Sequence, residues 1–422
     1  MDRFDLIVVG GGQAGCSAAL AAARQGLKVL LAEATGSLGG SATMALVNPY
    51  MPFKTRIYKG GDCRVLWLSD GIFREIHEAL NEDAIYGFSG EGGKFHEETM
   101  KVLFDRKMAE AGVTVLFHAT LCGVERDGRA LKSVSFATVG GIYTFAADTY
   151  VDATGDATLT AMADSPYQLG RTSDSLCQPM TLCFRMINVD VEKLDHSAID
   201  DLYQQYQAEG KIKNPREDVL IFKTRIENML HFNTTRIVKL NPTDPFDRSR
   251  AEAEAREQVV ELVNFLKENF EAFKNADLVM TAPEIGVRES RMIEARHVLT
   301  QEELKDAVKF DDAIAAGNYD IDIHSPDGSG TSHYYFPAGV YYTIPYRSLL
   351  PKDLDNLLVA GRCIGATHEA QASVRIMPIC SCTGEAAGIA AAIAKEDGVS
   401  VADADAQKIR TRLREVGAFV GE

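Results

Sequence analysis

Residues 5–33 hold the pattern that most restricts how this chain can fold. An apolar run at 6–9 is followed by Gly-Gly-Gly-Gln-Ala-Gly at 10–15, a stretch of small residues at 16–25 and a second apolar run at 27–32. The order strand, glycine-rich turn, helix and strand is typical of a βαβ unit that binds a dinucleotide. We therefore predict an α/β protein with a Rossmann-like domain at its N-terminal end.

The glycines and the acid of this unit each have a predicted mechanical role. Gly10 allows the tight turn, Gly12 lets the backbone approach a pyrophosphate, and Gly15 lets the helix pack closely on the sheet. The amides at the helix N-terminus then face the phosphates. Glu33 lies 21 residues after Gly12. A carboxylate there accepts hydrogen bonds from a ribose diol and repels a 2′-phosphate.

A second glycine-rich segment bears on whether the dinucleotide is NAD or FAD. Residues 36–43 read Gly-Ser-Leu-Gly-Gly-Ser-Ala-Thr. This segment resembles the one that flavoproteins of the glutathione-reductase-like superfamily lay along the ribityl-phosphate of FAD. The resemblance implies FAD as the cofactor. It also implies non-covalent binding, because the histidine that holds the flavin in succinate-dehydrogenase-like enzymes has no counterpart at 39–43.

Over nearly its whole length the chain resembles the GR2-type FAD-dependent oxidoreductases of that superfamily. Residues 96–124 are similar to the helix and strands beside the adenine, and 147–156 resembles the Ala-Thr-Gly-Asp turn under the pyrophosphate. Residues 356–363 resemble the final strand, and 368–378 the lead into a last helix at 380–394. A helix N-terminus aimed at the flavin places positive charge near its N1–O2 edge, which favours the reduced form.

The resemblance implies a set of cofactor-binding residues in these segments. They are Gly10, Gly12, Gln13, Ala14, Gly15, Glu33, Ala34, Gly39, Gly40, Ser41, Thr43, Cys122, Ala153, Thr154, Gly155, Asp156, Gly361, Arg362, Ser373, Val374 and Arg375. One departure is Gly361-Arg362, where many relatives have Gly-Asp. A second dinucleotide fingerprint is missing, since the glycines at 90–93 and 328–330 lie in polar, loop-like sequence.

The middle of the chain has a different pattern, which predicts an inserted domain. We expect a FAD-binding domain with ββα insertions at 1–160 and 346–422, and a mixed α+β substrate or cap domain at 161–345. Apolar residues recur at helical spacing from Val259 to Phe273, which predicts an amphipathic helix. Thr300-Gln301-Glu302-Glu303 is a capping-box signature that predicts a helix start.

Composition excludes several classes of protein. The 422 residues carry 44 Lys and Arg against 60 Asp and Glu, a formal charge of −16, which disfavours a nucleic-acid partner. No apolar run reaches the ~18 residues of a membrane span, and no room for a signal peptide precedes residue 6. We therefore expect a cytoplasmic protein without a membrane span. The eight cysteines form no C-x-x-C motif, so we predict no metal site.

Chemistry at a flavin needs polar side chains near the ring. Dehydrogenation needs a base such as His or Tyr, whereas reduction of an activated double bond needs an acid and arginines that hold carboxylates. The candidates that the resemblance brings toward the flavin are His231, Asn233, Arg236, Arg288, Glu289, Arg291, His333, Tyr346, Arg347, His368, Glu369 and Arg375. As catalytic residues we predict His368, Arg291, Arg236, His333 and Tyr346.

Structural roles are the alternative for the same residues. The pair His368-Glu369 also fits a hydrogen-bonded turn above the FAD, and Arg288, Glu289 and Arg291 fit an ion-pair network between the two domains.

The leading functional hypothesis is a FAD-dependent dehydrogenase or oxidase of a small polar organic substrate, with hydride transfer to flavin N5. The alternatives are a reductase of an unsaturated acid and a flavin subunit that relays electrons in a larger complex. The relay would need a cluster on another subunit, because this chain lacks cluster-binding cysteine spacing. We expect an external electron acceptor or donor as partner, and a homo-oligomer is compatible with the sequence.

Overall fold

A parallel β-sheet forms the centre of the computed structural model, which describes residues 3–59, 61–82 and 93–421. Its strands are ordered β5-β2-β1-β8, and β19 pairs with the free side of β8 in its C-terminal part. All neighbours among these five strands are parallel. They are β1 (Arg3–Val9), β2 (Val29–Ala32), β5 (Thr114–Leu116), β8 (Gly141–Asp152) and β19 (Leu357–Val359). This arrangement confirms the predicted α/β fold with a Rossmann-like domain.

The strand β8 belongs to two layers. Residues 146–152 pair with β1, whereas residues 141–145 pair antiparallel with β7 (Ala130–Thr138), which in turn pairs with β6 (Thr120–Asp127). This three-stranded meander follows β5 and returns the chain to the middle of the sheet. As a result, the end of β8 lies beside the end of β1, where the glycine-rich turn begins.

Two helices cross on one face of the sheet at unusually close range. A Cβ added to Gly384 of α9 (Met377–Asp397) would lie 2.0 Å from the carbonyl oxygen of Ala14 in α1 (Gln13–Arg24). At Gly388 it would lie 2.4 Å from the carbonyl oxygen of Ala18. The two glycines are therefore required for the contact. By length and composition α9 could cross a membrane, but 94% of its apolar window is buried, as in a core helix.

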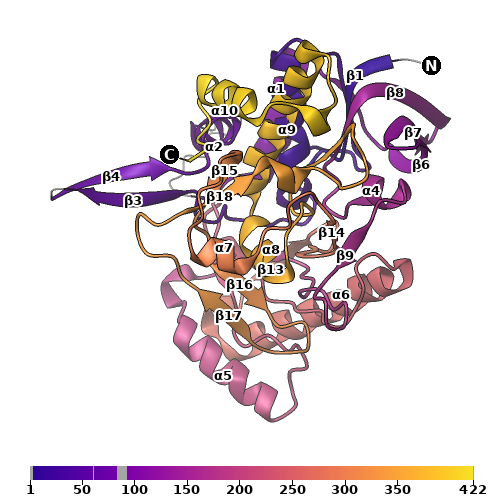
Figure 1. Cartoon of the computed structure of the whole chain (residues 1–422). Helices are drawn as coiled ribbons and strands as arrows, with labels where there is room; N and C mark the ends of the chain where they lie inside the picture. The colour runs from indigo at the N-terminus through magenta and orange to yellow at the C-terminus, as the bar shows by residue number, and fades with distance from the viewer. Residues whose placement is uncertain (1–2, 60, 83–92, 422) are drawn as a thin grey trace.

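A second apolar core belongs to the inserted segment. Its antiparallel sheet is ordered β11 (Ile221–Lys223), β12 (Leu230–Phe232), β10 (Phe184–Ile187) and β13 (Asp277–Thr281). This sheet packs with α5 (His196–Ala208) and α6 (Pro245–Asn269). Phe184 of β10 stacks on Phe232 of β12 with ring centres 4.5 Å apart. The predicted amphipathic helix is present as α6, with Val259, Leu262 and Leu266 in this core. It ends at Asn269, so Phe273 lies in the next turn. Figure 1 shows α5 and α6 on the side of the molecule opposite α1 and α9.

After the inserted segment, the chain rejoins the first core at an earlier residue than the sequence predicts. The core around α1 and α9 includes Leu299, Ile314 and Ile344, and the capping box on Thr300 starts α7 as predicted. The second core takes its residues from Leu46 and from 180–287. We therefore propose that the insert ends near residue 287 rather than at 345.

The other helices and strands connect these two cores. The two-stranded arm β3–β4 extends away from the body, as Figure 1 shows. Of the two glycine segments that the sequence assigns to loops, 328–330 lies between β16 and β17, and 90–92 lies outside the described residues. The remaining elements are β3 (Lys54–Lys59), β4 (Asp62–Trp67), α2 (Ile72–Glu82), α3 (Glu97–Glu110), α4 (Thr158–Met162), β9 (Tyr167–Leu169), β14 (Arg291–Ile293), α7 (Gln301–Lys305), β15 (Ala313–Gly317), β16 (Ile321–His324), β17 (Thr331–Tyr334), β18 (Tyr342–Pro345), α8 (His368–Val374) and α10 (Ala406–Glu415).

Candidate active site

A cleft of about 460 Å³ opens where β1, β2 and β8 end. Gly10 has φ +99°, and a Cβ there would lie 2.5 Å from the carbonyl oxygen of Ala153. A Cβ at Gly15 would meet the carbonyl oxygen of Gly10 at 1.8 Å, so both positions require glycine. By contrast, a Cβ at Gly12 meets no protein atom closer than 3.8 Å. The space beside Gly12 is therefore open, and the N-terminus of α1 faces the cleft.

Glu33 is fixed at the end of β2. Its Oε2 accepts a hydrogen bond from the Gly11 amide at 2.6 Å, and its Oε1 accepts from the Thr35 amide and hydroxyl at 2.8 Å each. The side chain is buried and still lines the cleft. A carboxylate held in this way is oriented to accept hydrogen bonds from a ribose.

Asp156 and Arg362 form an ion pair at the other end of the cleft. Arg362 donates to Asp156 at 2.7 Å, and the Ser290 hydroxyl donates to the same carboxyl at 2.7 Å. Burial alone would raise the pKa of Asp156, but Arg362, Ser290 and Arg248 outweigh it and lower that pKa. Asp156 is therefore ionised at neutral pH.

The donors left unsatisfied in the cleft wall fit an anionic dinucleotide. Among the described residues, the buried Nε atoms of Arg362 and Arg375 have no hydrogen-bond partner. Both side chains line the cleft, together with the glycine-rich turn and Glu33. The shape and donor set therefore match a group with phosphates, a ribose diol and a polar ring.

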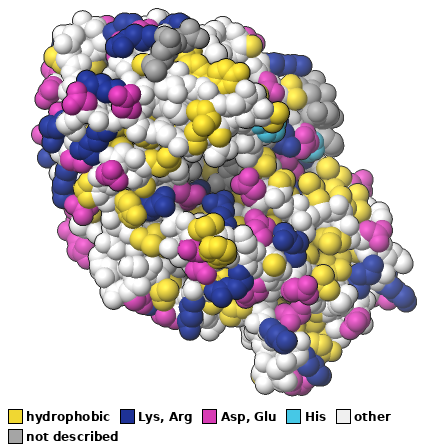
Figure 2. All heavy atoms as spheres, turned by 90° about the vertical axis from the view of Figure 1, so that its right-hand side faces the viewer, with side chains coloured by type: hydrophobic (Ala, Val, Ile, Leu, Met, Phe, Trp, Pro, Cys, Tyr) yellow, Lys and Arg dark blue, Asp and Glu magenta, His cyan; other side chains and the backbone are white. Residues whose placement is uncertain are grey.

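A second cavity of about 580 Å³ adjoins the cleft. The two share Ser41, Val287, Arg362, Arg375 and Met377 in their walls. Figure 2 shows one face of the molecule hollowed between its upper and lower parts, where basic and acidic side chains gather. A ligand in this cavity would lie next to whatever the cleft binds.

Asp322 on β16 is the centre of a polar cluster in this second cavity. The Tyr319 hydroxyl donates to its Oδ2 at 2.8 Å, and His324 Nε2 lies 3.3 Å from the same atom. Burial alone would raise the pKa of Asp322, but His324, Arg375 and Tyr319 outweigh it and hold that pKa well below its usual range. Its Oδ1 has no hydrogen-bond partner among the described residues, and His333 Nδ1 lies 3.7 Å away.

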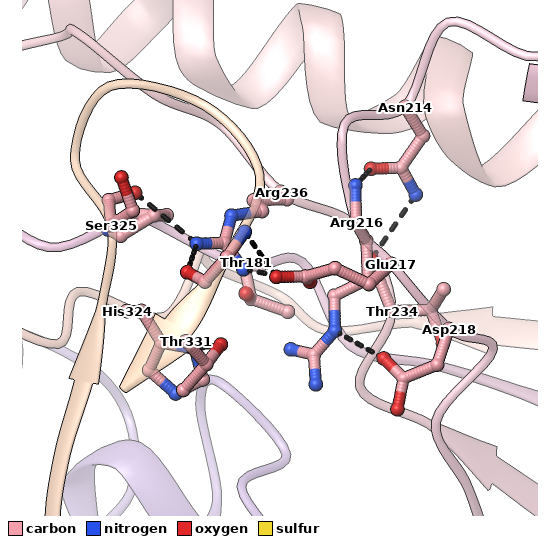
Figure 3. A network of polar contacts seen from close by, with 12 residues as sticks. Thr181, Asn214, Arg216, Glu217, Asp218, Thr234, Arg236, His324, Ser325 and Thr331 are labelled. Atoms are coloured by element: carbon pink, nitrogen blue, oxygen red, sulfur yellow. Dashed lines mark hydrogen bonds and ion pairs between the residues drawn. The ribbon is translucent and has the colours of Figure 1, made fainter. Parts of the chain in front are cut away.

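The β16–β17 hairpin that carries this cluster is tied to the inserted domain. Arg236 donates to the carbonyl oxygens of Gly330 at 2.8 Å and of Ser325 at 3.2 Å, and it pairs with Glu217 at 3.3 Å. Figure 3 shows the Arg236 side chain reaching the hairpin beside Thr331 and His324. The contact holds Asp322 and His324 against the cavity.

Arg288 forms another part of the wall of the second cavity. Arg288 donates to the Pro179 carbonyl at 2.8 Å, the Thr181 hydroxyl at 2.5 Å and the Asn233 side-chain oxygen at 3.2 Å. Burial, with the charges of Arg375 and Arg216 nearby, lowers the pKa of Arg288 to about 9. The side chain therefore remains charged at neutral pH.

Comparison with known protein families shows which family this chain belongs to. A family model described as FAD dependent oxidoreductase matches residues 5–413. This chain belongs to the FAD-dependent oxidoreductase family. FAD is therefore its cofactor, and the protein is an enzyme. The cleft beside Gly12 and Glu33 fits that cofactor, because it is lined by Arg362 and Arg375, whose buried Nε atoms have no partner among the described residues.

The solved structures that this FAD-dependent oxidoreductase matches are only distantly similar to it. A geranylgeranyl bacteriochlorophyll reductase-like protein from Thermoplasma acidophilum is 15% identical, with a TM-score of 0.49 over 99% of this chain and 85% of that one. The p-nitrophenol 4-monooxygenase of Pseudomonas putida is 11% identical, with a TM-score of 0.46 over 99% and 84%. A myxobacterial chondrochloren halogenase is 15% identical, with a TM-score of 0.44 over 99% and 79%. No curated protein matches the chain.

Most of the predicted cofactor-binding residues line the cleft. Those that do are Gly10, Gly12, Gln13, Ala14, Glu33, Ala34, Gly39, Gly40, Ser41, Ala153, Thr154, Gly155, Asp156, Arg362 and Arg375. Gly15 lies behind the turn, against Gly10. The Thr43 hydroxyl donates to the Leu38 carbonyl at 2.9 Å.

Four other predicted cofactor residues lie outside the cleft wall. Cys122 is exposed on β6, next to the lining residue Leu121. The Gly361 amide donates to the Thr383 hydroxyl at 3.1 Å. Ser373 bonds Tyr342 at 2.7 Å and is fully buried in α8 together with Val374. We no longer propose that Ser373 and Val374 contact the cofactor.

Of the five predicted catalytic residues, His333 alone lines the second cavity. His368 is buried, and its Nδ1 lies 2.7 Å from Glu289. Burial lowers the pKa of His368, but Glu289 outweighs it and the net pKa is raised. This geometry favours the structural alternative for His368. Glu289 also accepts from the Gln178 amide at 2.7 Å, so it serves as a buried anchor.

The other three predicted catalytic residues lie outside both cavities. Arg291 donates to the Asp156 carbonyl at 3.1 Å and lies over the ring of Tyr167. Arg236 donates to the β16–β17 hairpin. The Tyr346 hydroxyl donates to the Val401 carbonyl at 2.7 Å inside the first core. We therefore no longer propose these three residues as catalytic.

The wider candidate set divides in the same way. Asn233, Arg288 and Arg375 line the second cavity, whereas His231, Glu289, Arg347 and Glu369 line neither cavity. The sequence interpretation missed several cavity residues, among them Arg216, Tyr319, Asp322 and His324. Three of them lie in 318–324, where polar residues alternate with Ile321 and Ile323. That alternation is the signal of a half-buried strand with one polar face.

Proposed function

We propose that this FAD-dependent oxidoreductase transfers a hydride between FAD and a small polar organic substrate held in the second cavity. The observation that carries the proposal is the wall shared by the two cavities, which includes Ser41, Arg362, Arg375 and Met377. When bound, FAD supplies two-electron redox chemistry. The dehydrogenation direction, non-covalent binding and membership of the GR2-type group are part of this proposal, and so is a cytoplasmic location.

The proton that leaves a substrate hydroxyl needs an acceptor in the cavity. Asp322 is held ionised, and its Oδ1 has no hydrogen-bond partner among the described residues. In this proposal Oδ1 accepts a hydrogen bond from the substrate hydroxyl and orients it, because a carboxylate with so low a pKa is a weak base. His333 is exposed and its Nδ1 lies 3.7 Å from Oδ1, so it takes the hydroxyl proton to solvent while the substrate carbon gives up its hydride. An external acceptor completes the cycle.

Anaerobic reduction of the flavin tests the proposed function. The purified enzyme is mixed without oxygen with hydroxy acids, polyols, sugars and amines, and the visible flavin band is followed. We expect one class to bleach the band. Asp322→Asn should keep its FAD and lose bleaching, whereas Asp320→Asn, which lies outside both cavities, should keep both. A wild-type rate in Asp322→Asn would contradict the role proposed for Asp322.

Reduction of an unsaturated acid is the second candidate, and Arg288 is the observation that favours it. Arg288 is charged at neutral pH and no carboxylate pairs with it among the described residues, so it suits the carboxylate of an unsaturated acid. If no compound bleaches the oxidised enzyme, the chemically reduced enzyme is mixed with unsaturated acids. Reoxidation by one of them would replace the dehydrogenase proposal with this one.

A further inference from the structure

Arg288 differs from the other arginines of the two cavities in its partners. Arg216 pairs with Asp218 at 2.8 Å, Arg362 with Asp156 at 2.7 Å, and Arg375 lies 3.8 Å from Asp322. Arg288 contacts the neutral oxygens of Pro179, Thr181 and Asn233. Within residues 3–59, 61–82 and 93–421, no carboxylate pairs with it. A charged group enclosed without a counter-ion is costly.

The acids of the second cavity do not supply the missing charge. Asp218 and Asp322 are paired with Arg216 and Arg375, and Glu217 pairs with Arg236 outside the cavity wall. The fourth cavity arginine, Arg362, has Asp156. Burial lowers the pKa of His324 to about 3, so this side chain is neutral and does not add positive charge.

Two other arginines place positive charge near Arg288. Arg375 and Arg216 both lower its pKa, so their charges act at the same point in the cavity. Figure 3 shows the Arg216 guanidinium bonded to Asp218 through one nitrogen, with no bond drawn to its two terminal nitrogens. The cavity therefore presents a local excess of donors with one uncompensated positive charge. Such a site is complementary to a single negative charge with two acceptor oxygens.

We propose that the second cavity takes a substrate bearing a carboxylate, and that Arg288 binds that carboxylate. This inference rests on the proposed function, because it names the substrate class for the same cavity. Leu220, Phe222, Met51 and Ile376 form the apolar part of the wall, which suits the carbon portion of such a molecule. The orphan Oδ1 of Asp322 is left for a hydroxyl on that portion.

Binding of propionate to the oxidised holoenzyme tests this inference without turnover. Propionate and its neutral isostere propionamide are titrated at constant ionic strength, and binding is followed by the flavin visible band and by thermal unfolding. We expect saturable binding of propionate and none of propionamide. Inorganic phosphate should bind more weakly than propionate, because one positive charge is uncompensated. Equal effects of propionate and propionamide would overturn the proposal, and tighter phosphate binding would overturn its carboxylate part.

Variants of two arginines locate the binding group. Arg288→Gln should weaken propionate binding on the order of ten- to a hundredfold, because a charged hydrogen bond is lost. Arg347→Gln is the matched control, since Arg347 pairs with Asp312 outside both cavities. Should Arg288→Gln not fold, Arg288→Lys serves, and it should retain weaker propionate binding. Wild-type affinity in the folded Arg288 variant would contradict the assignment.

Further results distinguish a failure of this inference from a failure of the proposed function. If Arg288→Gln shifted the flavin reduction potential and left propionate affinity unchanged, Arg288 would serve the flavin and the inference would fall. Propionate binding by an enzyme that no compound reduces would overturn the proposed dehydrogenase and leave this inference standing. If neutral substrates alone bleached the flavin band and propionate did not bind, the proposed dehydrogenase would stand and this inference would fall.

Discussion

Single residues set the shape of the FAD cleft and the chemistry of the cavity beside it. Gly10 and Gly15 are needed by the protein itself, because a side chain there would collide with backbone atoms. Gly12 is different, since open space lies beside it. In the second cavity, counting the described part of the chain, Asp322 Oδ1 has no hydrogen-bond partner and no carboxylate pairs with Arg288. The roles of these residues can therefore be separated by substitution.

Gly12→Ala should fold normally and lose FAD affinity. The added methyl group meets no protein atom closer than 3.8 Å, so it intrudes only on a bound pyrophosphate. A clash of about 1–3 kcal/mol corresponds to a loss of affinity of roughly ten- to a hundredfold. Titration of FAD into the apoprotein measures it, with Gly328→Ala in the β16–β17 loop as control. Unchanged FAD affinity would show that the pyrophosphate does not approach Gly12.

Asp322→Asn should slow flavin reduction on the order of ten- to a hundredfold, because the carboxylate that orients the substrate hydroxyl is lost. FAD content should stay the same, because Asp322 lines only the second cavity. The rate is measured anaerobically by stopped-flow absorbance once a substrate class is known. A loss of FAD together with activity would indicate a structural role instead.

At the scale of helices and strands, sequence patterns correctly predicted the elements whose residues are neighbours in the chain. The strand β1, the turn and α1 are specified by residues 5–25, and the Thr300 capping box marks α7. The site cluster on β16 could not be placed, because Asp322 meets Arg375, and the β16–β17 hairpin meets Arg236, only after the chain has folded. Tyr346 shows the converse, since a polar side chain near the expected site donates to a core carbonyl and lines neither cavity.

Helix α9 contains a buried acid that makes stability depend on pH. Burial raises the pKa of Glu385 to about 8, although the amide of Ile72 donates to it at 3.1 Å. Below about pH 4.5 the carboxyl is protonated in both the folded and the unfolded chain. Between that pH and about 8 the folded protein binds a proton that the unfolded chain has lost, so stability falls as pH rises.

Glu385→Gln should therefore be more stable than the wild type at pH 8, on the order of a few kcal/mol. The difference should shrink toward pH 5, since the amide imitates the protonated acid. Thermal unfolding at several pH values measures it. A difference that stays constant with pH would show that Glu385 does not titrate in this range.

At the scale of the whole molecule, a buried ion pair joins the two cores. Arg185 of β10 in the inserted domain pairs with Glu97 of α3 in the FAD-binding domain, and both side chains are buried. The pair therefore fixes the inserted domain, and with it the second cavity, against the FAD cleft.

Removal of one partner should cost more than removal of both. Arg185→Met or Glu97→Leu alone leaves a buried charge unpaired, which destabilises a protein by about 3–5 kcal/mol. The double variant should recover much of that loss. Chemical denaturation of the four proteins in a double-mutant cycle measures the coupling. Additive effects would contradict a direct interaction between the two groups.

The most direct test of the account is the visible spectrum of the purified protein and its FAD content. We expect a flavin band, one FAD per chain, and release of unmodified FAD on denaturation. Gly12→Ala, purified alongside, should be paler. A colourless wild-type protein that takes up no added FAD would contradict the assignment of the cleft, and with it the proposed hydride transfer in the cavity beside it.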